Sequence, residues 1–160
     1  EKHPTTYSNI QRDLEEKAIF EKVKPHQLCL GICRGSQFLC VMNGGLLIQN
    51  VGKHAGFGTH QIINKRDDME RYDITSTHHQ MQYPFNLENG EDYTTLYYAS
   101  RRSPYYEGDK VDYPPHEPEI VLYHKEGMPK CLAVQGHPEM MRAEAPVIKM
   151  LNQLLNRYVA

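Results

Sequence analysis

The sequence predicts an α/β protein whose first strand lies in a parallel sheet. Residues 9–24 carry apolar side chains at helical spacing, and Pro25 ends this pattern. Residues 26–33 (HQLCLGIC) form a short, nearly continuous apolar run, which is typical of a strand buried on both faces. A second helical pattern covers residues 36–42 and stops at the NGG of residues 43–45. Helix, buried strand, sharp turn and helix in this order are typical of an α/β unit.

Strand-like segments dominate the rest of the chain. The turn KEGMP (residues 125–129) joins the last two, which predicts a hairpin and therefore an antiparallel extension of the sheet. Residues 103–118 are rich in Pro and Tyr and are expected to form an ordered surface loop. After Pro146, apolar residues recur on one face of a closing helix. The expected strands are 58–65, 72–76, 93–99, 119–124 and 130–135.

The composition is that of an ordinary soluble domain. The chain has 160 residues, 39% hydrophobic residues, 24% charged residues and a formal net charge of -2, so it carries no basic footprint for nucleic acid or a membrane surface. No run reaches the roughly 18 apolar residues of a membrane span. Three of the four cysteines lie in apolar runs, where reduced thiols of intracellular proteins are usual. We therefore expect a cytoplasmic protein with a single domain over residues 1–160.

Cys33 stands where the predicted strand turns into the predicted helix. A side chain at such a turn projects from the carboxyl end of the strand toward free N–H groups of the helix. These groups and the helix dipole favour an anion, so we expect the thiol to be shifted toward thiolate. Gly31 and Gly35 flank it as G-x-C-x-G and relieve crowding, and the backbone N–H of Arg34 would face an oxyanion formed by attack on a carbonyl. The alternative is a buried structural cysteine beside two loop glycines.

A nucleophilic cysteine needs a base, and the base needs a group that orients it. Among nine histidines, His137 stands out because it follows an apolar strand, in the motif QGHPEMM. Side chains two residues apart point the same way in extended chain, so Glu139 is expected beside His137, with Pro138 fixing the backbone between them. Alone, HPE is more typical of a solvated polar turn. Together with G-x-C-x-G, it predicts a Cys-His-Glu arrangement.

GICRGSQFL (31–39) together with VQGHPE (134–139) closely resembles the class I glutamine amidotransferase superfamily, and within it the γ-glutamyl hydrolase-like branch, peptidases of the γ-glutamyl-aminobutyrate hydrolase type. HPTTY (3–7) is similar to the loop after that branch's glycine-glycine-acid turn, MNGG (42–45) matches the stop of its elbow helix, and TSTHHQM (75–81) is similar to its Ser-x-His-His-Gln loop. The resemblance implies a flavodoxin-like, doubly wound, mostly parallel sheet with an antiparallel hairpin extension. It also implies that strands and a glycine turn with a second oxyanion N–H precede Glu1, so we expect this domain to be N-terminally incomplete.

Carried over residue by residue, the resemblance implies three catalytic roles. Cys33 would be the nucleophile, His137 the general base and acid, and Glu139 the orienting carboxylate. Arg34 would contribute one N–H of the oxyanion hole.

The resemblance also implies a set of substrate-binding residues. Gln37, one turn into the elbow helix, would hold the substrate from its side chain. Thr77, His79 and Gln80 would frame the α-amino and α-carboxylate ends of a glutamyl group. Gly136 departs from the branch, in which an aromatic residue often precedes HPE, and this difference is expected to reshape the pocket beside His137.

No metal and no cofactor is expected. Adjacent His78 and His79 have no convergent acidic or cysteine spacing, and a C-x3-C pair from Cys29 and Cys33 has no second ligand pair. His54 and His60 are expected to be surface or strand residues. The chain also lacks a GxxxxGK[ST] phosphate loop.

The resemblance implies hydrolysis of a γ-glutamyl amide bond in a small-molecule substrate. One interpretation is a glutaminase whose ammonia feeds a partner synthetase or amidoligase, because the chain has no nucleotide-binding motif of its own. The second is a free-standing γ-glutamyl peptide or amide hydrolase, and the third is a catalytically idle binding module. The sequence leaves the leaving group, the partner and a homodimer open.

Overall fold

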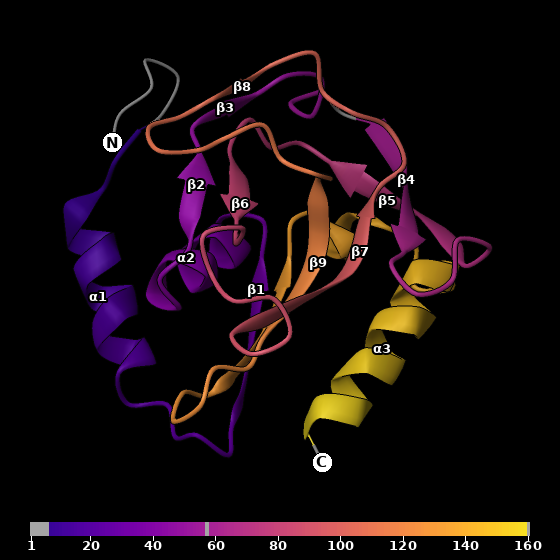
Figure 1. Ribbon diagram of the computed structural model, residues 1–160. Helices are drawn as coiled ribbons and strands as arrows, with labels where there is room; N and C mark the ends of the chain where they lie inside the picture. Colours follow the sequence, from indigo (N-terminus) through magenta and orange to yellow (C-terminus); the bar gives the residue numbers. More distant parts are fainter. Residues whose placement is uncertain (1–6, 57, 160) are drawn as a thin grey trace.

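The computed structural model describes residues 7–56 and 58–159, and a six-stranded sheet forms its centre (Figure 1). Two further pairs of strands lie in the upper part of Figure 1. In spatial order the central strands are β1 (Leu28–Ile32), β10 (Lys130–Val134), β9 (Pro118–Tyr123), β7 (Tyr93–Ala99), β4 (Gly58–Asn64) and β5 (Arg71–Ser76). The small pairs are β2 (Leu46–Ile48) with β6 (Met81–Tyr83), and β3 (Asn50–Val51) with β8 (Tyr106–Glu107).

The sheet is mixed. Strands β1, β10, β7 and β5 run in one direction, but among the described strands only β1 and β10 are parallel neighbours. The connections between β4 and β5 and between β9 and β10 span only residues 65–70 and 124–129. Because a parallel crossover needs a dozen or more residues, these links impose antiparallel pairing. The α/β class is confirmed, and its antiparallel part extends well beyond the hairpin at 125–129.

Helices cover both faces of the sheet. The long helix α3 (Pro146–Val159) lies on one side in Figure 1, and α1 (Ile10–Phe20) and α2 (Arg34–Met42) lie on the other. A short 3-10 turn, η1 (Pro138–Met140), follows β10. Within residues 7–56 and 58–159, every helix is too short or too polar to cross a bilayer.

Alternating side chains of β10 divide the core between these layers. Leu132 and Val134 belong to a cluster with the apolar face of α3, whereas Cys131 and Ala133 belong to a cluster with α2. This period of two is what a strand covered by helices on both faces requires. The four cysteines are free.

Two details of the sequence interpretation are corrected at the start of the chain. Strand β1 lies at the edge of the described sheet rather than inside it, so Leu30 is 48% exposed instead of buried. In α1, the residue that packs into the core is Phe20, whereas Ile10 and Leu14 are exposed. The helix expected from the spacing is confirmed, but its buried face differs from the expected one.

Candidate active site

Cys33 connects β1 to α2 in a conformation that few residues adopt. Its φ is 49° and its ψ is -107°, a positive φ that is uncommon for a residue with a side chain. The Cys33 N–H donates to the carbonyl of Val134 at 2.8 Å, and the Cys33 carbonyl accepts from the N–H of Ser36 at 3.0 Å. These bonds hold the strained turn between the parallel strands and the first turn of the helix. Strained residues of this kind cluster at functional sites.

The two glycines of G-x-C-x-G differ in how closely neighbouring atoms approach them. A Cβ on Gly31 would lie 2.5 Å from the backbone C and O of Gly35 and 2.7 Å from Leu39 Cδ1. A Cβ on Gly35 would meet nothing within 4 Å. Close approach of strand and helix therefore requires glycine at Gly31, and crowding does not require it at Gly35.

The resting thiol of Cys33 is not shifted toward thiolate. Burial raises the pKa of Cys33, the backbone N–H of Arg34 lowers it, and the charge of Glu139 raises it again, so that the net pKa is above the usual thiol value. The expectation of a thiolate is wrong for this state, because desolvation outweighs the N–H group at the helix start. The backbone N–H of Arg34 does lie close enough to the Cys33 thiol to lower its pKa.

His137 and Glu139 form a direct pair beyond the end of β10. His137 Nδ1 lies 2.6 Å from Glu139 Oε1, and the His137 N–H donates to the carbonyl of Thr75 on β5 at 2.8 Å. Glu139 lies in the 3-10 turn rather than in extended chain, yet the predicted contact forms. Since β10 is the parallel neighbour of β1, Cys33 and His137 follow adjacent strand ends. Within the described part of the chain, no hydrogen bond joins the Cys33 thiol to His137.

Gly136 marks a close approach between β10 and β5. A Cβ there would lie 2.8 Å from Ile74 Cδ1 and 2.9 Å from the carbonyl oxygen of Thr75. The space that a side chain would need before HPE is thus filled by Ile74. The side chain of Ile74 therefore explains why this chain has glycine at the position where the branch often has an aromatic residue.

Gln37 and Gln80 lie together beside the elbow. The buried Gln37 side chain donates from Nε2 to the backbone carbonyl of Gln80 at 2.9 Å, and Gln80 Nε2 donates to Gln49 Oε1 at 2.9 Å. With Arg34, these three glutamines line a cleft of about 600 Å³ that runs between α1 and α2. Gln49 has no counterpart among the residues predicted from sequence, because only the fold brings it to Gln80.

Thr77 and His79 lie in the loop between β5 and β6, and both are half-buried. The His79 carbonyl accepts from the Val51 N–H at 2.7 Å, which ties the loop to β3. Neither side chain joins the Gln37–Gln80 contact. Of the HPTTY segment, residues 3–6 lie outside the described residues.

The side chain of Arg34 forms ion pairs with helix α1, which were not predicted from the sequence. Its guanidinium binds two acidic side chains of α1, with Nη2 at 2.5 Å from Asp13 Oδ1 and Nη1 in contact with Glu16. Arginine presents several donors in a fixed fork, which suits binding two carboxylates at once. Arg34 therefore fixes α1 over one wall of the cleft.

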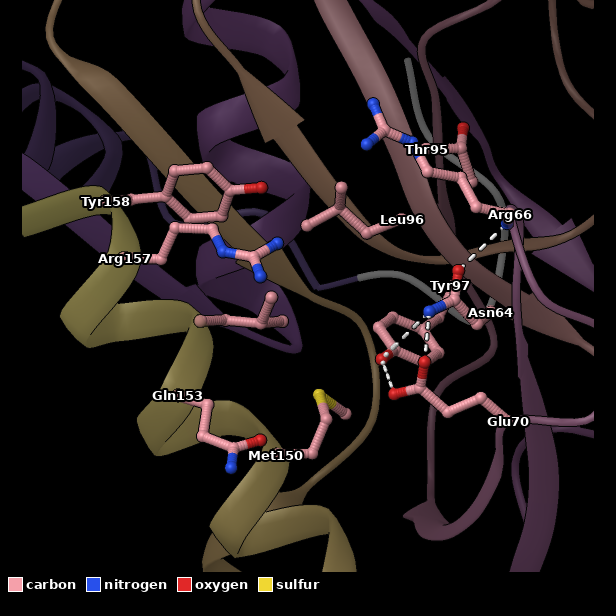
Figure 2. A pocket seen from close by; sticks show the side chains of 11 residues that line it. Asn64, Arg66, Glu70, Thr95, Leu96, Tyr97, Met150, Gln153, Arg157 and Tyr158 are labelled. Atoms are coloured by element: carbon pink, nitrogen blue, oxygen red, sulfur yellow. Dashed lines mark hydrogen bonds between the residues drawn. The ribbon is translucent and has the colours of Figure 1, made fainter.

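A second cavity lies far from the elbow, between strands β4 and β7 and helix α3 (Figure 2). It measures about 190 Å³, and Glu70 and Tyr97 form a hydrogen-bonded group at one side while Arg157 and Gln153 extend from α3. Its lining contains no cysteine or histidine. Glu70 is paired with its neighbours, which is typical of a structural network.

His54 and His60 form part of a buried cluster with Glu117 and Glu119. The expectation that His54 is a surface or strand residue is wrong, because it lies between β3 and β4 and is 1% exposed. His60 does lie in a strand, β4, and is 5% exposed. The signal in the sequence is EPE at 117–119, in which two acids at strand spacing come directly before the apolar residues 120–122.

Comparison with known proteins identifies the class. The Peptidase C26 family model matches residues 1–97, and the chain belongs to this family. Its fold resembles that of a candidate GMP synthase component from Thermoplasma acidophilum, with a TM-score of 0.61, 15% identity, and coverage of 94% of this chain and 65% of that one. It also resembles a glutamine amidotransferase from Thermotoga maritima, with a TM-score of 0.50, 18% identity, and coverage of 92% and 55%.

These matches place the chain in the class I glutamine amidotransferase superfamily. The chain spans less than two thirds of the length of either structure. A search of curated proteins gave no match.

Proposed function

We propose that the protein hydrolyses a γ-glutamyl amide bond, with Cys33 as nucleophile, His137 as general base and acid, and Glu139 as the carboxylate that orients the imidazole. One observation carries the proposal: a cysteine in a strained elbow and a hydrogen-bonded His–Glu pair follow the ends of two adjacent parallel strands. Membership of the Peptidase C26 family supports the same chemistry.

The reaction begins with a neutral thiol, because burial raises the pKa of Cys33. His137 takes the thiol proton as the sulfur attacks the γ-carbonyl carbon, and the carbonyl oxygen becomes an oxyanion beside the Arg34 N–H. His137 then gives the proton to the departing nitrogen, which leaves as an amine or ammonia and a γ-glutamyl thioester remains. Water attacks the thioester while His137 takes a proton from it. The C–S bond then breaks, the imidazolium returns the proton to the sulfur, glutamate leaves and the Cys33 thiol is restored. Substrate binding would bring thiol and imidazole together, since catalytic hydrogen bonds often tighten only in the complex.

The cleft supports a substrate larger than glutamine. Gln37 and Gln80 would bind the glutamyl part. The cleft of about 600 Å³ toward α1 is lined by Arg34, the neighbour of Cys33, but not by Cys33 or His137 themselves, and it would take an amine or peptide leaving group. We therefore favour a γ-glutamyl amide or peptide hydrolase.

A second candidate is a glutaminase that supplies ammonia to a synthetase or amidoligase. The likeness to the candidate GMP synthase component favours it. Both candidates act on small molecules, use the same three residues and fit a cytoplasmic protein.

The test is a mass-spectrometric assay of glutamine and a panel of γ-glutamyl amides and peptides side by side. We expect turnover of the larger substrates that disappears in Cys33→Ala and persists in Cys29→Ala, which removes a half-buried thiol from the same strand region. A preference for glutamine would support the second candidate. Equal background rates in wild type and Cys33→Ala, with both folded by circular dichroism, would overturn the hydrolase proposal and leave the idle binding module.

A further inference from the structure

A buried cluster of imidazoles and carboxylates lies apart from the proposed catalytic residues. His60 projects from β4, Glu119 from β9, and His54 from the connection between β3 and β4. Their exposed fractions are 5%, 0% and 1%. Burial of a carboxylate away from water costs several kcal/mol unless a cation or hydrogen bonds compensate it. The buried carboxylate of Glu119 therefore requires a compensating partner, either a hydrogen-bond donor or a cation.

Hydrogen bonds do not supply that partner in the described part of the chain. Both carboxylate oxygens of Glu119 and both ring nitrogens of His60 are buried without a hydrogen bond. His60 Nε2 lies 2.8 Å from Glu119 Oε1, but the two atoms are not aligned as donor and acceptor. Two polar atoms that approach closely without such alignment can both point at a third position.

The donor atoms lie close to one another. One atom from each of His54, His60 and Glu119 lies within 4.8 Å of the other two. Glu119 Oε1 is 2.8 Å from His60 Nε2 and 3.9 Å from His54 Nδ1. Two ligands at about 2.1 Å from a tetrahedral ion are roughly 3.4 Å apart. The observed separations fall on either side of that value.

A second carboxylate orients one of the imidazoles. Glu117 Oε2 lies 2.9 Å from His54 Nε2, so that the other ring nitrogen, Nδ1, faces Glu119. Glu117 is itself held by the Tyr106 hydroxyl at 2.6 Å and by the Ser103 N–H. Metal-binding histidines commonly donate their second N–H to a carboxylate in this way, which fixes the tautomer.

We propose that His54, His60 and Glu119 bind one divalent transition-metal ion of the zinc type. Two imidazoles and one carboxylate are a ligand set that zinc accepts, with a fourth position for water. The Ser76 hydroxyl is hydrogen-bonded to His54 Nδ1 at 3.3 Å, and a bound ion would replace this contact. The ion links β4, β9 and the β3–β4 connection. His78 stacks on His54 with ring centroids 4.6 Å apart, so the ion also steadies the loop that follows β5.

The competing account is a buried ion pair between His60 and Glu119 with no metal. A titration of the chelator-treated protein with Co²⁺ separates the two. We expect one equivalent to bind, with visible absorption of a nitrogen–oxygen site and without the thiolate charge-transfer band that cysteine ligation gives, and Zn²⁺ to displace it. We also expect the melting temperature to rise with added Zn²⁺, as mass action requires.

Two variants and a control assign the site. His60→Asn and Glu119→Gln are expected to weaken Co²⁺ binding at least 100-fold, whereas His26→Asn, which changes an exposed histidine, leaves it unchanged. Unchanged binding in folded His60→Asn or Glu119→Gln would overturn the proposal. A thiolate band in the wild type would do the same.

Because either variant risks misfolding, X-ray absorption of the Zn²⁺-loaded wild type gives an independent answer. We expect nitrogen and oxygen neighbours with the scattering of two imidazoles. A spectrum without imidazole, or a folded wild type that binds no metal, rules the site out. None of these measurements depends on the proposed hydrolase activity.

Discussion

Gln37 Nε2 donates a hydrogen bond at 2.9 Å to the backbone carbonyl of Gln80, which ties the elbow helix to the loop after β5. The Gln37 side chain is buried, so removal of it leaves a carbonyl of the loop without its donor. Leaving a fully buried acceptor unpaired costs about 1–3 kcal/mol, and because this contact is part-buried the loss is expected at the lower end of that range. The contact therefore sets the shape of the proposed glutamyl site.

We expect Gln37→Ala to raise KM about 10-fold, with a smaller effect on kcat, because the loop and the substrate lose the same donor. Steady-state kinetics on the best substrate of the panel measures this. Gln153→Ala, an exposed position on α3, is the control. An unchanged KM in folded Gln37→Ala would contradict the assigned role.

Glu139→Gln is expected to lower kcat about 10-fold, whereas His137→Ala lowers it roughly 10²–10⁴-fold. The amide can still accept a hydrogen bond from the ring, but it no longer balances the charge of an imidazolium. Because the Glu139 side chain is half-exposed, water also solvates the imidazolium, and this keeps the decrease in kcat small. Glu144→Gln, an exposed neighbour, controls for surface charge. If Glu139→Gln lowered kcat as much as His137→Ala, the role of Glu139 would not be limited to orienting the imidazole of His137.

Gly31→Ala is expected to destabilise the fold by about 1–3 kcal/mol or more, because the new methyl group meets the Gly35 backbone at 2.5 Å. Gly35→Ala is its matched control. The methyl group there faces open space in a helix, so stability should stay level or rise by about 0.5–1 kcal/mol. Urea unfolding of the three proteins gives both values. Equal losses would show that strand and helix do not meet as closely as described.

Alkylation of Cys33 should have a midpoint above the pH usual for a thiol. Burial raises the pKa of Cys33, outweighing the Arg34 N–H, so the folded state favours the neutral thiol. The stability that this contributes is present below the pKa of the unfolded thiol and is lost as pH rises through the folded value. Peptide-level mass spectrometry after timed iodoacetamide treatment follows Cys33 separately from the other cysteines. A midpoint below the usual value would mean that the helix N-terminus dominates after all.

Glu70 should contribute stability that acid removes. It accepts hydrogen bonds from Tyr97 Oη at 2.6 Å and Asn64 Nδ2 at 2.5 Å (Figure 2). It also accepts one from Tyr72 Oη at 3.0 Å. Burial raises the pKa of Glu70, but the hydrogen bonds from Tyr97, Asn64 and Tyr72 together lower it by more than burial raises it. The net pKa therefore lies below the usual glutamate value.

The stability gained from ionised Glu70 is therefore present above the unfolded pKa and lost as pH falls through the folded value. We expect the difference in unfolding free energy between wild type and Glu70→Gln to be below about 1 kcal/mol at neutral pH and to shrink as the pH falls below about 4. Glu126→Gln, at an exposed turn, serves as reference. A difference in unfolding free energy that does not depend on pH would show that the ionised carboxylate of Glu70 does not stabilise the fold.

Periodicity and turn residues determined most of the elements. The strand at 93–99 and the helix after Pro146 occur where the sequence places them, since both are long enough to show a repeating pattern. Strands β2, β3 and β6 escaped prediction because two or three residues show no period. Their pairing depends on partners more than 30 residues away.

The sequence by itself determined the local chemistry: the elbow at Cys33, and the His137–Glu139 contact, which depends on residues only two apart. Only the tertiary structure decided the environment of these groups. Burial raised the pKa of Cys33 against the local helix effect, and Ile74 filled the space beside Gly136. It also gathered His54, His60 and Glu119 from three segments of the chain. Desolvation and convergence depend on distances through space, and no spacing along the chain encodes them.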